Sequence, residues 1–138
     1  MRVMAIDYGK SRIGIALSDP LGVISQPLTS IKVKSQKELF RQILKIIQES
    51  DVGLIIIGNP LSHKGEATEM SDEISRFIKR LKKRINTEIK LWDERFTSQY
   101  AMNILKAMKV KRQKGLVDQV AASIMLDEYL RSCSTCTT

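Results

Sequence analysis

Apolar residues in the first quarter of the chain occur in three short runs. The runs span Arg2–Asp7, Arg12–Ser18 and Val23–Ile31. The segments Tyr8–Ser11 and Asp19–Gly22, which separate them, contain the glycine, serine and proline residues typical of turns. Two such short connections in succession predict three antiparallel strands arranged as a meander.

The spacing then changes to that of helices alternating with strands. Ser35 and Glu38 form a capping-box pattern ahead of a helical stripe that ends near Ile47. Val52–Gly58 is apolar on both faces, which is typical of a central parallel strand. Four further elements are expected: a helix with apolar positions from Met70 to Ile85, a strand over Glu88–Trp92, a helix over about Thr97–Met108 and a last helix over about Val117–Leu130.

The order β-β-β-α-β-α-β-α-α predicts an α/β fold. Its sheet should be mixed and five-stranded, with three antiparallel strands followed by crossover strands, and helices should flank it. No linker, repeat or low-complexity block divides the 138 residues. We therefore expect one domain over residues 1–131 and a disordered polar tail over 132–138.

Three acidic residues stand at positions where local structure does not demand them. Asp7 ends the first strand and Glu94 follows the fifth, although a turn cap and a pair with Arg95 are ordinary explanations for them. Asp118 is more informative because it belongs to the inward face of the last predicted helix. The other members of that face are Ala121, Ala122, Met125, Leu126 and Tyr129.

A buried carboxylate without a compensating charge is costly, and this face of the helix offers no lysine or arginine. Carboxylates at strand ends and on an inward helix face suit hard divalent cations, so we expect Mg²⁺ or Mn²⁺. The chain carries 23 Lys and Arg against 15 Asp and Glu, a net charge of +8. Such a basic surface indicates a nucleic-acid partner, which the acids alone would repel.

Four segments together resemble one bacterial family. They are residues 7–19, 58–61, 92–98 and 114–122, and the likeness extends over residues 1–131. The family is the YqgF family of pre-16S rRNA nucleases, which are also described as Holliday-junction resolvases. The resemblance implies a ribonuclease H-like fold, metal-binding catalytic acids at Asp7, Glu94 and Asp118, and processing of the 5′ end of pre-16S rRNA in ribosome biogenesis.

One position departs from the better-known resolvases of this fold. Those enzymes carry a further acid one helical turn after the last catalytic one, whereas this chain has Ala121. The departure favours precursor rRNA, with pre-ribosomal particles as partners, over a DNA junction. Resolution of Holliday junctions stays open as the alternative.

Basic residues near the acids are candidates for substrate binding. Lys10 and Arg12 follow Asp7, and Arg95 follows Glu94. A basic segment leads into Asp118 and is expected to guide phosphates. Its members are Lys106, Lys109, Lys111, Arg112 and Lys114. The run Lys79–Arg84 is interpreted equally well as a solvated helix face or as a substrate track.

Two other classes of function remain open on the residues alone. The turn Asp7-Tyr8-Gly9 also fits the first phosphate-binding motif of actin-like phosphotransferases, although the chain has length for only one of their two domains. A catalytically silent nucleic-acid-binding domain would leave Asp118 unexplained. Cys133 and Cys136 resemble half a zinc site without a second ligand pair. No membrane segment or secretory leader is evident, so we expect a cytoplasmic protein.

Overall fold

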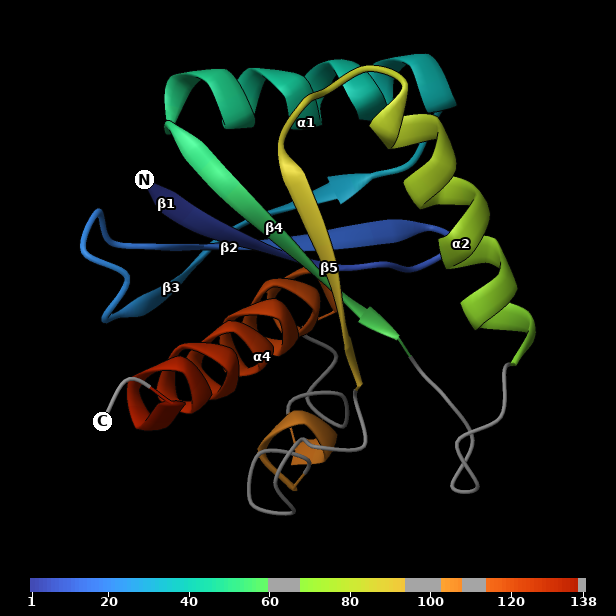
Figure 1. Ribbon diagram of the computed structural model, residues 1–138. Coiled ribbons are helices and arrows are strands. Elements are labelled where there is room, and N and C mark those ends of the chain that lie inside the picture. Colours follow the sequence, from blue (N-terminus) through green and yellow to red (C-terminus); the bar gives the residue numbers. More distant parts are fainter. Residues whose placement is uncertain (60–67, 94–102, 108–113, 137–138) are drawn as a thin grey trace.

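The computed structural model describes residues 1–59, 68–93, 103–107 and 114–136. Five strands form one sheet in the order β3-β2-β1-β4-β5 (Figure 1). The strands are β1 (Arg2–Asp7), β2 (Arg12–Ser18), β3 (Ser25–Lys32), β4 (Val52–Asn59) and β5 (Glu88–Asp93). β1, β2 and β3 pair antiparallel, whereas β4 and β5 continue the sheet parallel to β1. The predicted mixed sheet is confirmed.

Helices cover both faces of this sheet (Figure 1). Helices α1 (Gln36–Glu49) and α2 (Glu69–Lys82) lie on one face, and α4 (Lys114–Cys136) lies on the other. A short helical segment over 103–107 falls within the predicted third helix, whose remaining residues lie outside the described part of the chain. None of the helices in the described ranges is long and apolar enough to cross a membrane.

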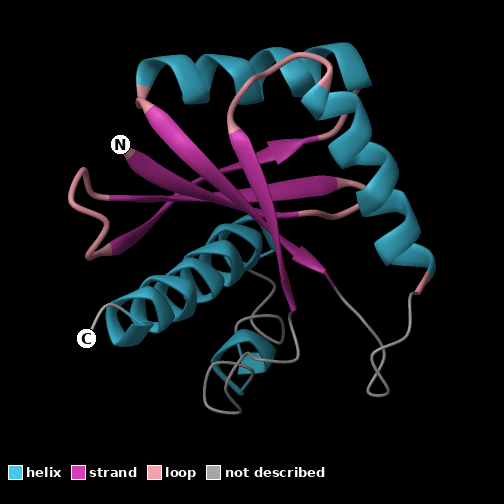
Figure 2. Cartoon of the chain, in the orientation of Figure 1, coloured by secondary structure: helices cyan, strands magenta, loops and turns pink. Residues whose placement is uncertain are grey.

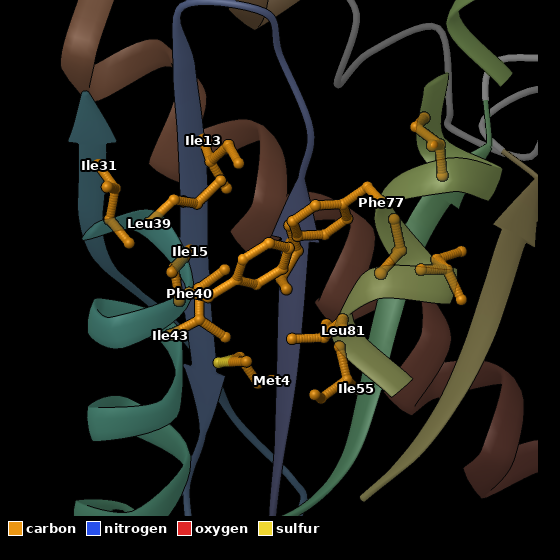
Figure 3. Close-up of a cluster of buried hydrophobic side chains, with 14 of the residues drawn as sticks. Met4, Ile13, Ile15, Ile31, Leu39, Phe40, Ile43, Ile55, Phe77 and Leu81 are labelled. Atoms are coloured by element: carbon orange, nitrogen blue, oxygen red, sulfur yellow. The ribbon is translucent and has the colours of Figure 1, made fainter. Parts of the chain in front are cut away.

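Alternation along the strands builds two separate apolar cores. Met4 and Ile6 of β1 join the core beneath α1 and α2, together with Phe77 of α2 (Figure 3). Ala5, which lies between them in the strand, belongs to the core beneath α4 with Ala16 and Ala122. These small residues let α4 lie close to the sheet, because no long side chains separate the two backbones.

The helix α1 begins at the predicted cap, but the capping box forms only in part. Ser35 accepts a hydrogen bond from the backbone N–H of Glu38 at 3.2 Å. The Glu38 carboxylate does not return that bond and instead accepts bonds from Arg41 and Gln42. A charged guanidinium one turn away therefore attracts the carboxylate more strongly than the neutral backbone N–H does.

The helix α4 is longer than the sequence predicted at both ends. Residues 132–136, which we expected to belong to a disordered tail, continue the helix. Two local interactions support this last part of α4. Arg131 pairs with Asp127 at 3.1 Å, and Ser132 Oγ donates to the carbonyl oxygen of Tyr129 at 2.7 Å. The predicted helix ends near Leu130 because the prediction used the apolar positions alone and took no account of side-chain contacts of this kind.

Candidate functional site

The position of Asp7 is fixed by strand pairing. Asp7 is the last residue of β1 and lies opposite Gly14 of β2. Since Met4 and Ile6 face α1 and α2, alternation directs Ala5 and Asp7 to the other face, where α4 lies. The carboxylate thus leaves an apolar strand at its end, on the face that α4 covers.

The start of α4 rests on the strand partner of Asp7. A Cβ atom built on Gly14 would overlap the carbonyl group of Asp118 and would lie 2.8 Å from the backbone nitrogen of Gln119. Only glycine allows this approach of helix backbone to strand backbone. The approach places Asp118, whose side chain is partly buried, directly over the residue that pairs with Asp7. The backbone of Asp118 therefore lies next to the strand pair that contains Asp7.

The inward face of α4 is the one that the sequence indicated. Ala122, Met125 and Leu126 are buried, and Ala121 and Tyr129 are partly buried beside them. Asp127 lies on the solvated side, paired with Arg131. Asp118 therefore lies where α4 contacts the sheet and Asp127 lies on the solvated side, as predicted.

Two further oxygen-bearing residues lie where β4 and β5 end. Asn59 and Asp93 are paired across these parallel strands, and both strands end on the same side of the sheet (Figure 2). The side-chain oxygen of Asn59 is buried and has no hydrogen-bond partner among the described residues. The sequence analysis did not single out either residue, although a polar residue directly after a buried strand is a usable signal for a site. Glu94 follows Asp93 in the chain and lies outside the described residues.

The predicted substrate-binding residues Lys10 and Arg12 diverge. Lys10 Nζ lies 3.6 Å from Glu73 Oε1 of α2. Arg12 stands two residues before Gly14 on β2, so alternation places it on the α4 face. The remaining candidates for substrate binding follow Glu94 or precede Asp118, and their side chains lie outside the described part of the structure. These are Arg95, Lys109, Lys111, Arg112 and Lys114.

A mixed set of charges surrounds Tyr8, which follows Asp7. Burial and the Glu73 carboxylate raise the pKa of Tyr8, whereas Arg80, Arg76 and Lys10 lower it. Near the other end of α4, the Cys133 side chain, burial and Glu88 raise the pKa of Tyr129 to about 12. The Tyr129 and Trp92 rings pack edge to face, with their centroids 5.7 Å apart. Tyr129 therefore belongs to the packing of α4 against β5, while Tyr8 belongs to the charged edge of the sheet.

Within the described ranges, no three Asp, Glu, His or Cys side chains gather closely enough to hold a metal ion. The predicted third acid, Glu94, is outside those ranges. The described part of the proposed site therefore consists of Asp7 and Asp118, because alternation from Ile57 directs Asn59 to the opposite face of the sheet, under α1 and α2.

A family model described as "RuvX: Holliday junction resolvase" matches residues 1–132. The chain belongs to the RuvX family. Two relatives of this RuvX chain carry the name "Putative pre-16S rRNA nuclease". The one from Thermoanaerobacter pseudethanolicus is 40% identical over 135 residues, which cover 96% of this chain and 97% of the relative. The one from Dictyoglomus turgidum is 39% identical over 136 residues, covering 97% and 96%. The resemblance of the sequence motifs to the family of pre-16S rRNA nucleases is confirmed.

Solved structures agree with this RuvX fold at low sequence identity. RuvC of Thermus thermophilus superposes with a TM-score of 0.60 at 10% identity and covers 96% of this chain and 97% of its own. The Fowlpox virus resolvase, solved with Holliday junction DNA, has a TM-score of 0.59 at 14% identity and covers 96% and 99%. The predicted ribonuclease H-like fold is confirmed.

Proposed function

We propose that the protein is a metal-dependent nuclease that processes the 5′ end of pre-16S rRNA. The observation that carries the proposal is the contact of α4 with Gly14, which brings Asp118 over the strand partner of Asp7. The names of the relatives, which are about 40% identical over nearly the whole chain, support the substrate. We further propose that the enzyme acts in the cytoplasm on pre-ribosomal particles.

The oxygen donors at this edge of the sheet fit a hard divalent cation. Asp7 and Asp118 supply carboxylate oxygens, which are the ligands that hard divalent cations prefer. We propose that Asp7, Asp118 and Glu94 hold Mg²⁺ or Mn²⁺. The chemistry that the ions would supply is activation of the attacking water and stabilisation of the departing oxygen.

The protein's own residues would position the phosphodiester. The net charge of +8 attracts a polyanion over distances near the Debye length, about 8 Å in physiological salt. Arg12, on the same sheet face as Asp7, is placed to neutralise a phosphate beside the acids. The close contact of α4 with β2 would hold the two carboxylates at a fixed separation, as catalysis by positioning requires.

Holliday-junction resolution is the second candidate, favoured by the family description and by the RuvC-like fold. Ala121 lies on α4 one turn after Asp118, so the described helix carries no fourth acid at that position. A resolvase also needs two active sites held at a fixed spacing. The alanine at position 121 therefore supports RNA cleavage over junction resolution.

The test compares two aspartates of the same helix. Asp118→Asn should abolish cleavage of a precursor 16S leader RNA in Mn²⁺, while the control Asp127→Asn should cleave like the unmodified protein. Asp127 is a suitable control because it faces solvent and forms only a surface pair with Arg131. A four-way DNA junction is assayed in parallel. Paired symmetric nicks in the junction, made faster than any RNA cut, would assign the resolvase function instead.

A further inference from the structure

The helix α2 carries a dense basic segment that the proposed catalytic site does not use. Six of the nine residues from 76 to 84 are lysine or arginine, and no acid occurs between Glu73 and Glu88. All six of these basic side chains are exposed. Basic residues in the last turn of a helix interact favourably with its dipole, but that effect falls off within one turn. Arg76 lies too far from the end of α2 for this explanation.

Three arginines of the segment recur every four residues. Arg76 and Arg80 share one side of α2, about 6 Å apart along its axis, and Arg84 follows two residues after the last residue of the helix, Lys82. We call these three residues the arginine row. Arg84 ends the row against α1, where its guanidinium lies 4.4 Å from the centre of the Phe40 ring. Like charges at this spacing repel each other, so the row weakens the isolated helix.

The row begins beside the proposed catalytic edge. Phe77 of α2 packs against Tyr8, with the ring centres 5.0 Å apart, and Tyr8 directly follows Asp7. Arg80 follows Phe77 by three residues, so helical geometry places it next to Phe77, and Arg76 lies one turn before Arg80 on the same side of α2. The pKa of Tyr8 agrees with this placement, since the positive charges of Arg80 and Arg76 lower it against the raising effect of burial. Lys10, bridged to Glu73 of α2, stands at the same end.

The two arginines nearest Tyr8 are not engaged by carboxylates. Among the described residues, neither Arg76 nor Arg80 forms a salt bridge. Glu73, the acid of α2 nearest to them, is paired with Lys10. Two exposed guanidinium groups near an aromatic ring offer donors of the planar geometry that phosphate oxygens accept in pairs.

We propose that the arginine row of α2, together with Lys10, binds the phosphodiester backbone of the RNA that flanks the cleavage position. The inference rests on the proposed nuclease function. The strand would cross the edge of the sheet at Tyr8, passing from the face of α4 to the face of α2. Backbone contacts of this kind carry no sequence information, so they fix the position of the RNA without selecting its bases.

The experiment measures binding separately from cleavage. A fluorescently labelled single-stranded RNA of the precursor leader is titrated with the full chain in EDTA, at several salt concentrations. The variant is Arg76→Gln/Arg80→Gln, and the control is Lys79→Gln/Lys82→Gln. The control removes the same charge from the opposite flank of α2, so general electrostatic attraction falls equally in both proteins.

We expect the arginine variant to bind about tenfold more weakly than the control. Its slope of log affinity against log salt should be shallower by about 1.4 units, from two lost contacts at about 0.7 each on a single strand, with the control nearly unchanged. Arg84 is left in place because it packs on Phe40. Circular dichroism and thermal unfolding check that both variants are folded.

The outcomes separate this inference from the proposed function. If the unmodified protein cuts the RNA but the arginine variant and the control have equal affinities and slopes, the row does not bind RNA and this inference alone fails. If the unmodified protein neither cuts nor binds the RNA, both proposals fail. A row that binds an acidic protein instead of RNA would also give equal RNA affinities in the two variants.

Discussion

Gly14 holds the proposed site together, and its replacement by alanine should separate the two carboxylates. The backbone of Gly14 does not require glycine for its own conformation, since the positive-φ glycine among the described residues is Gly22. The effect of Gly14→Ala is therefore purely steric. The added Cβ would overlap the Asp118 carbonyl, which is helix backbone and cannot rotate away.

The size of the effect follows from the contact. Carbon atoms pack at about 3.5–4.0 Å, so the start of α4 must withdraw from β2 by on the order of 1 Å. Overpacking of this kind costs about 1–3 kcal/mol of the free energy of unfolding. A displacement of about 1 Å between reacting groups lowers catalysis by about 100-fold. We therefore expect a folded, less stable protein whose cleavage rate falls about 100-fold.

Gly53→Ala provides the matched control. A Cβ on Gly53, the second residue of β4, would meet the Sδ and Cβ atoms of Met1 at 2.5 and 2.8 Å. Met1 is 80% exposed and precedes β1, so the whole residue can move into solvent and stability should change by less than about 0.5 kcal/mol. Urea unfolding followed by Trp92 fluorescence measures stability, and cleavage of leader RNA in saturating Mn²⁺ measures activity. The reasoning is refuted if Gly14→Ala matches Gly53→Ala in both measurements.

Three further perturbations test other parts of the molecule. Asp7→Asn and Glu94→Gln should each abolish cleavage in saturating Mn²⁺ while leaving stability in EDTA unchanged or slightly raised, because the acids repel one another without metal; a rate near that of the unmodified protein would remove the residue from the site. Alanine at four of the five basic positions before Asp118 should make the slope of log affinity against log salt for RNA shallower by about 3 units, and an unchanged slope would assign these residues to a solvated surface. Their positions are Lys109, Lys111, Arg112 and Lys114. Asp19 accepts hydrogen bonds from the backbone N–H groups of Leu21, Val23 and Ile24, which lower its pKa. The pKa of Asp19 in the folded protein lies below the unfolded value of about 3.9. The ionised carboxylate therefore stabilises the fold fully above the unfolded pKa, and this stabilisation is lost as the pH falls through the folded pKa. The drop in urea midpoint from pH 6 to pH 3 should therefore be smaller for Asp19→Asn, and equal drops would contradict the role of these bonds.

The sequence predicted the order of the elements because their periodicities are distinct. Alternating and helical patterns separated β1 to β3 from α1, and the inward face of α4 followed from residue spacing alone. The convergence of Asp7 and Asp118 was predicted as a cluster of acids, but its cause was not. The contact through Gly14 joins residues about 100 positions apart, and no local pattern reports such a distance.

The sequence did not reveal which side chains Lys10, Arg12 and Asn59 would lie beside in the folded protein. Lys10 pairs with Glu73 of α2, whereas Arg12, two residues later, lies on the face of α4. Their proximity in the chain suggested a shared role, yet the turn between β1 and β2 sends them to opposite faces of the sheet. Asn59 was missed because a single polar residue after a strand is common in turns, and only its burial without a partner marks it.

The separation of acids and bases by the sheet explains how one small domain can attract RNA without disabling its own acids. Asp7 and Asp118 lie on the face of the sheet that α4 covers, whereas Arg76 and Arg80 belong to α2, which packs on the opposite face. Guanidinium groups in direct contact with the acids would compete with a cation for the same oxygens. Placed across the sheet, they act over about 10 Å, where salt weakens but does not abolish attraction. Glu73 holds Lys10 on the α2 side in the same way. A phosphodiester strand can bridge the two faces because it carries a negative charge at every nucleotide. One phosphate can therefore reach the acids while neighbouring phosphates contact the arginine side chains. This arrangement requires a polyanion longer than a single nucleotide, and cleavage of a dinucleotide should accordingly be slow even when the acids are intact.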